Sequence, residues 1–349
     1  MFTRARRPLL ALLVAVTSTG LGAACKTERK DVASIGPASP SATASSSSSA
    51  ATPGTPSAPG SSAGPRAPGP LGRTDADLAP LRESIRRLAP LHVRGAAPKS
   101  GEWLAEHHEP GESFEQYLNA GPITPTPVRA SLVVQPLGDL GKENDRVVAA
   151  VAVAMAAFFG LPARVATPLS LRVLPRNARR PSRGYGEQLL TGQILKELVP
   201  RLPDDAMAFI GFTSSDLYPG DDWNYVFGEA SLDDRVGVWS LARNGNPSAS
   251  DAAYRLALVR ALKIAMHETG HMFGMHHCTA YRCNMAGVNS LDESDAQPTW
   301  LCPECLAKLS WATGSSPEEH LRRMLAFSHT AGFKAEESHY TKSLAALQK

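Results

Sequence analysis

Apolar positions recur at helical or strand spacing along most of the chain beyond residue 75. Leu78, Leu81, Ile85 and Leu88 lie three or four residues apart, which predicts a helix over 78–91. Similar patterns predict helices over 143–159, 186–198, 250–273, 306–311 and 318–327, and strands over 130–134, 169–174, 206–212, 224–227 and 236–241. Because strands and helices alternate, the expected fold is mixed α/β (α+β) with one main domain.

Glycines and a serine set the expected ends of the two longest helices. Gly160 follows the 143–159 helix directly and is a good C-terminal stop. The 250–273 helix follows the turn sequence NGNP, and Ser248 is its expected cap because Asp251 lies three residues further on. Gly274 then provides the residue at which this helix ends.

The first 25 residues have the pattern of an export signal. Three arginines near the start precede an apolar run over 8–24, which is typical of a secretory signal peptide. The run ends at Cys25 in the sequence LGAAC, which resembles a bacterial lipoprotein processing site, where the cysteine is lipidated. An ordinary cleaved signal and an uncleaved anchor are the alternatives.

The segment that follows, 26–75, is rich in Ser, Pro, Ala and Gly. Such a segment cannot bury enough apolar surface to fold, and we expect a disordered tether. Together with Cys25 it predicts an exported protein of the cell envelope, held to the membrane by a lipid anchor.

Charge gives little support for a polyanionic partner. The chain has 36 basic and 33 acidic residues, a formal net charge of +3. Outside the signal, basic residues are dense only over 176–183, which we expect to be a solvated loop. No nucleic-acid partner is therefore expected.

The expected 250–273 helix carries a metal-binding pattern. His267 and His271 lie four residues apart, on one face of the helix, and can bind one zinc ion from neighbouring turns. After Gly274 the chain can turn to bring His277 round as a third ligand, which leaves an open position for water. Glu268 lies beside the metal and can act as general base on the zinc-bound water, which predicts peptide hydrolysis.

Four cysteines follow the third histidine. Cys278, Cys283, Cys302 and Cys305 could form a closed tetrahedral site for a second, structural zinc ion. Two disulfides are an alternative, because exported cysteines usually meet oxidising conditions. A redox dithiol at Cys302 and Cys305 is another, and it predicts a solvent-accessible thiol of low pKa.

The whole run from His267 to Cys305 resembles the archaemetzincins. Their signature is H-E-x-x-H-x-x-G-x-x-H-C followed by C-x-M and C-x-x-C, and Cys283-Asn284-Met285 supplies the middle element. The last spacer, sixteen residues, is one residue shorter than in the family pattern. The likeness extends upstream through 103–118, 213–218 and 225–230.

This resemblance implies a metzincin-like fold and zinc-dependent peptide hydrolysis. It implies a mixed twisted sheet with an antiparallel edge strand, a long active-site helix and a small C-terminal zinc-stabilised subdomain. It also implies that Met285 forms a methionine turn beneath the catalytic zinc, and that a peptide or protein substrate binds along the edge strand, for which 224–227 is the candidate.

The expected organisation has five parts. These are a signal peptide (1–25), a tether (26–75), an N-terminal extension (76–128), a catalytic domain (129–313) and a C-terminal helical tail (314–349). Histidines at 320, 329 and 339 lack ligand spacing and are expected at the surface. The alternative to a zinc metallopeptidase is a catalytically silent, zinc-stabilised binding module of the envelope, which would have no need of Glu268.

Overall fold

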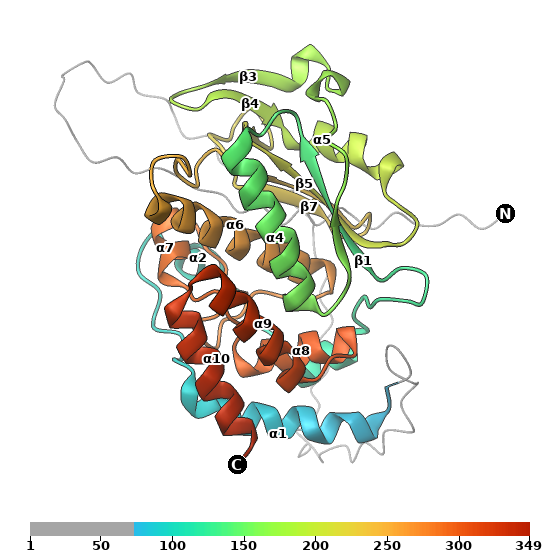
Figure 1. The fold of residues 1–349 in the computed structure, drawn as a ribbon, viewed down its shortest axis with the longest axis vertical. Coiled ribbons are helices and arrows are strands. Elements are labelled where there is room, and N and C mark those ends of the chain that lie inside the picture. The colour runs from blue at the N-terminus through green and yellow to red at the C-terminus, as the bar shows by residue number, and fades with distance from the viewer. Residues whose placement is uncertain (1–72) are drawn as a thin grey trace, which may run out of the picture. The chain divides into compact units, whose positions relative to one another are not determined.

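A computed structural model describes residues 73–349 of this chain (Figure 1). The expected signal peptide, the lipidation site Cys25 and nearly all of the tether lie outside the described residues. Within 73–349, no helix is both long enough and apolar enough to cross a membrane.

The described part is built on a five-stranded sheet with the strand order β2-β1-β5-β8-β7. Its strands are β1 (Ser131–Leu137), β2 (Ala163–Val165), β5 (Ala206–Thr213), β7 (Gly228–Ser231) and β8 (Val236–Ser240). Neighbouring strands are parallel except β7, which is antiparallel to β8 at one edge. The sheet is therefore mixed, and it ends in an antiparallel edge strand.

Both faces of this sheet are covered. Side chains alternate along a strand, so Leu132 and Val134 of β1 join one hydrophobic cluster and Val133 joins the other. Helices α4 (Lys142–Phe159) and α6 (Asp251–Met272) pack on the first face, where their buried residues complete the larger cluster (Figure 1). Helix α5 (Thr191–Leu198) packs on the second face.

Two expected elements are wrong in type. The 169–174 segment is not a strand: it contains a 3-10 turn, and only Leu169 bridges to β1. The 186–198 segment is not one helix, because its first part is strand β4 (Gly186–Leu190). That strand pairs with β3 (Arg179–Ser182) and β6 (Asp216–Tyr218), so part of the expected solvated basic loop is a paired strand.

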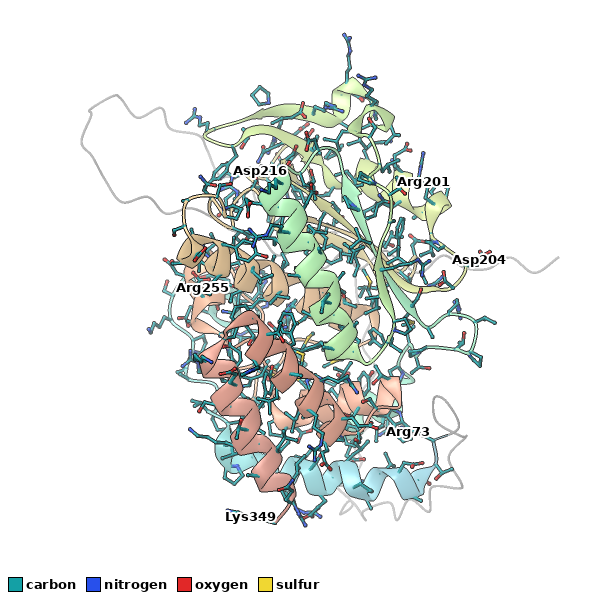
Figure 2. All side chains as sticks on the ribbon, viewed as in Figure 1. Arg73, Arg201, Asp204, Asp216, Arg255 and Lys349 are labelled. Carbon is teal, nitrogen blue, oxygen red and sulfur yellow. The ribbon has the colours of Figure 1, made fainter. Side chains whose placement is uncertain are left out.

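The buried carboxylate of Asp216 connects this second sheet to the chain after β8. The Arg243 guanidinium donates to both of its oxygens, at 2.9 and 2.7 Å, which satisfies a charge with no exposed surface. By contrast, Arg201, Asp204 and Arg255 are exposed to solvent (Figure 2).

Two expected boundaries also need correction. The edge strand is not 224–227, where only Val226 makes an isolated bridge to Leu217, but the next four residues, β7. Helix α6 is capped by Ser250, whose side chain accepts from the Ala253 N–H, and not by Ser248. Ser248 instead donates its own N–H to the Asn246 side chain within the preceding turn.

The N-terminal and C-terminal segments of the described chain pack together. Helix α1 (Leu78–Leu88), at the position expected from its leucine spacing, contacts α8 (Pro303–Thr313) and α10 (Lys334–Leu347). The two helices expected near the C-terminus are present as α8 and the longer α9 (Pro317–Ala331), and α10 lies within the expected helical tail over 314–349, for which the sequence pattern predicted no second helix boundary. Leu321 and Met324 of α9 are buried against α4.

Candidate active site

Three buried histidines meet at the C-terminal end of α6. His267 and His271 lie on successive turns of the helix, and Gly274, at φ 80°, redirects the chain after it. His277 then returns to the same place, so that one ring nitrogen from each histidine lies within 4.8 Å of the others. The structure thus brings together the three ligands expected for the catalytic zinc.

The Nδ1 atom of each histidine contacts an oxygen acceptor elsewhere in the protein. Nδ1 of His267 donates to the Asn284 carbonyl at 2.7 Å, and Nδ1 of His271 donates to the Met275 carbonyl at 2.6 Å. Because a carbonyl can only accept, both rings carry their proton on Nδ1 and direct an Nε2 lone pair inward. His277 places Nδ1 2.9 Å from the Glu109 carboxylate, and its buried Nε2 has no partner within 73–349.

These lone pairs fit a zinc ion. The Nε2 atoms of His267 and His271 are 3.0 Å apart, close to the separation of about 3.3 Å between two nitrogens of a tetrahedral zinc site. Without a cation, two facing lone pairs would repel each other. Burial lowers the pKa of His267 to about 3 and lowers that of His271, so both rings are in the neutral form that binds metal.

Glu268 lies beside the histidines with its carboxylate buried. Neither oxygen has a hydrogen-bond partner among the described residues, and burial raises the pKa of Glu268 to about 8. A cation held by the histidines would lower this pKa again, because an adjacent positive charge favours the carboxylate.

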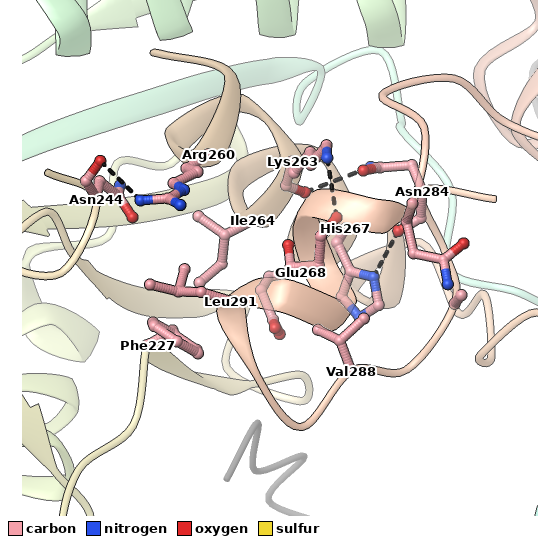
Figure 3. A pocket seen from close by; sticks show the side chains of 13 residues that line it. Phe227, Asn244, Arg260, Lys263, Ile264, His267, Glu268, Asn284, Val288 and Leu291 are labelled. Carbon is pink, nitrogen blue, oxygen red and sulfur yellow. Dashed lines mark hydrogen bonds between the residues drawn. The ribbon is translucent and has the colours of Figure 1, made fainter. Parts of the chain in front are cut away.

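A pocket opens next to Glu268 and His267 (Figure 3). Apolar side chains of Phe227, Val288 and Leu291 line it, together with Ile264 of α6. Phe227 immediately precedes the edge strand β7, so the pocket lies between the active-site helix and one end of that strand. Arg260 and Lys263 add charged groups to its lining.

Met285 packs directly against the helical turn that separates the two histidines. It is fully buried, and a Cβ added to Gly270 would lie only 2.6 Å from its sulfur. Glycine at position 270 therefore allows the methionine to approach the helix backbone.

The four cysteines form a second buried cluster. Their sulfur atoms lie within 4.8 Å of one another, and Sγ of Cys278 is 3.6 Å from Sγ of Cys302. Sulfurs around a tetrahedral zinc ion are separated by about 3.8 Å, so the cluster has the size of such a site.

The geometry of the four cysteines matches neither two disulfides nor a redox dithiol, the two alternatives to a zinc site. None of the four cysteines forms a disulfide in the described part of the chain. Cys302 and Cys305 are no more than 1% exposed, whereas a redox dithiol needs an accessible thiol. Backbone N–H groups of Cys302 and Met285 lie 3.1 and 3.4 Å from the Cys283 sulfur, an arrangement that stabilises a thiolate.

Comparison with known proteins gives the family. Residues 187–311 match the model of Peptidase family M54. Human archaemetzincin-2 is 34% identical over 277 residues, which cover 68% of this chain and 76% of the relative. The chain belongs to the archaemetzincin family. It is therefore a zinc-dependent peptidase that acts on peptide substrates.

Human archaemetzincin-1 and an archaeal archaemetzincin match less of the chain. Human archaemetzincin-1 is 30% identical, with 64% of this chain and 51% of the relative covered. The crystal structure of archaemetzincin from Methanopyrus kandleri is 28% identical, covers 54% of this chain and 97% of its own, and gives a TM-score of 0.42.

Some groups at or near this archaemetzincin site could not be identified from local patterns. Glu109, which contacts His277, lies far from it in sequence, and Asn244 of the pocket follows β8. The expectation of surface histidines is wrong for His320, which is buried and donates from Nδ1 to the Phe158 carbonyl. His339 is partly buried and stacks on Trp300, and His329 is exposed as expected.

Proposed function

We propose that this archaemetzincin hydrolyses peptide bonds with Glu268 as general base and with His267, His271 and His277 as the ligands of its catalytic zinc. The observation that carries the proposal is the buried Glu268 carboxylate, which has no partner within 73–349 and lies beside three convergent imidazoles. Burial of an unpaired carboxylate costs several kcal/mol. A metal site that only stabilises the fold is therefore not expected to contain one.

When bound, the zinc ion supplies Lewis-acid chemistry: it lowers the pKa of a water towards about 7 and polarises the scissile carbonyl. The residues of this chain do the rest. Glu268 accepts the proton of the attacking water and delivers it to the leaving amine. Met285 supports the helical turn that carries the histidines, the role of a methionine turn.

We further propose that the peptide lies along the edge strand β7. β7 ends the sheet, and its backbone pairs only with β8 within the described residues. Phe227, the residue before β7, lines the pocket beside Glu268, so an added strand would pass the reactive groups. The second zinc ion is assigned to the four cysteines, where it would be structural.

Zinc content separates this function from a silent binding module. We expect two zinc ions per chain in the purified protein and one in His271→Ala, because that substitution removes a ligand from one site only. Chelator-sensitive cleavage of a mixed peptide library should be lost in parallel. Metal would be measured by inductively coupled plasma mass spectrometry.

His329→Ala is the matched control for this experiment, because His329 is exposed and contacts Glu337 instead of other histidines. It should retain two zinc ions and full cleavage. A wild-type protein with one zinc that His271→Ala leaves unchanged, and with no cleavage, would favour the binding module.

We also propose that the enzyme is exported and anchored to the cell envelope by a lipid on Cys25. The basic N-terminus, the short apolar run and the LGAAC sequence support this location. We expect the protein to incorporate labelled palmitate in a bacterial host, and Cys25→Ala to lose the label and the membrane association. Wild-type protein without label would contradict the anchor.

A further inference from the structure

Glu109 connects the N-terminal extension to the third histidine. It lies between α2 (Trp103–Glu106) and α3 (Phe114–Ala120), upstream of the residues that match the family model. Both of its oxygens are 2.9 Å from Nδ1 of His277, and one also accepts from Nε1 of Trp103 at 3.0 Å.

His277 differs from the other two histidines in what orients it. His267 and His271 are fixed on a helix, and their Nδ1 atoms donate to backbone carbonyls near the active site. His277 lies on the loop after that helix, and its Nδ1 contact is a side chain from a separate segment, 168 residues away. Of the three Nδ1 contacts, only that of His277 therefore comes from outside the active-site helix and the loop that follows it.

The segment that carries Glu109 is itself held firmly against the catalytic domain. Glu112 forms an ion pair with Lys308 of α8 at 3.0 Å, and the two side chains are only 5% and 1% exposed. Tyr117 of α3 donates its hydroxyl to the Phe273 carbonyl at the end of α6, at 2.7 Å. These two contacts hold the segment against α8 and against the end of α6.

Trp103 also contacts His277, through its indole ring. Its ring meets the ring of His277 edge-on, with centroids 5.1 Å apart, and its backbone N–H donates to Glu293 at 3.0 Å. A Cβ added to Gly287 would lie 2.4 Å from the indole, so the ring packs closely on the chain that follows Met285. Trp103 and Glu109 therefore both contact the His277 ring.

We propose that Glu109 is a positioning residue for the catalytic metal. Its carboxylate accepts the Nδ1 proton of His277, fixes the ring with Nε2 toward the other histidines, and makes that nitrogen a stronger ligand. This inference rests on the proposed histidine zinc site and extends it, because it makes the N-terminal extension an integral part of that site.

Metal affinity of the full-length protein tests this role without reference to cleavage. We expect Glu109→Ala to weaken zinc binding at the histidine site about 10- to 100-fold, the usual cost of losing such a partner. Glu109→Gln keeps an acceptor for both N–H groups and should recover part of the loss. Zinc affinity would be measured by chelator competition, and cobalt(II) absorption would distinguish the histidine site from the thiolate site.

Glu106→Gln is the matched control: it neutralises an exposed carboxylate of the same segment and should bind zinc like wild type. Wild-type affinity at the histidine site in Glu109→Ala would overturn the inference. The inference would also be overturned if Glu109→Ala weakened zinc binding equally at the thiolate site and lowered the Tm, since that result indicates general destabilisation. If wild type itself bound no metal at the histidines, the proposed function would fail instead.

Discussion

Glu268→Gln is expected to lower kcat/KM for peptide cleavage by about 10²- to 10⁴-fold, the range for loss of a general base. The amide has the size of the carboxylate but cannot accept the proton of the attacking water. Zinc content should remain at the wild-type value because Glu268 is not among the converging ligands. Folding should be preserved as well, since the substitution removes a buried charge that has no partner within 73–349.

The measurement is cleavage of a peptide found in the library screen, with zinc content and Tm determined on the same samples. Glu336→Gln is a suitable control, because Glu336 is a partly buried carboxylate of α10 that bonds to Thr299 away from the histidines. Wild-type cleavage by Glu268→Gln would exclude its role as base. Loss of zinc from this variant would show that the carboxylate is needed to hold the metal.

The parts of this site that could be predicted from the sequence depend on short spacings. Two histidines four residues apart on a helix must share a face, and Gly274 permits the turn that returns His277. The strands over 206–212 and 236–241 are confirmed as β5 and β8, because their apolar runs are buried on both faces of the sheet. Local pattern and tertiary structure agree at these places.

Three other features, namely one strand, one buried histidine and the position of Glu109, depend on contacts with residues that are distant in sequence. Gly186–Leu190 is a strand because it pairs with β3 and β6, although its sequence also suits the first turns of a helix. His320 lies among polar residues in sequence but is buried where α9 packs on α4. Glu109 has no ligand spacing, and only the packing of the extension against α8 and α6 brings it to His277.

Cys302→Ser is expected to remove the second zinc ion and to destabilise the protein by about 3–5 kcal/mol, the cost of breaking a buried charged network. A change of that size corresponds to a fall in Tm of roughly 5–9 °C for the 277 residues over 73–349, at about 2.1 cal/mol/K of unfolding entropy per residue. Cys302 caps α8, where its sulfur accepts the Cys305 N–H, so both the metal and the start of the helix would be affected.

The loss should extend to the catalytic site because the two clusters share a loop. Cys278 follows His277 directly, and its N–H donates to the Met285 carbonyl at 2.7 Å. Thermal unfolding and metal content of Cys302→Ser would test this coupling, with Ser310→Ala, at a buried position of the same helix α8, as the control. Unchanged zinc and Tm would contradict a structural metal. A wild-type protein destabilised by reductant alone would show instead that the four cysteines form disulfides.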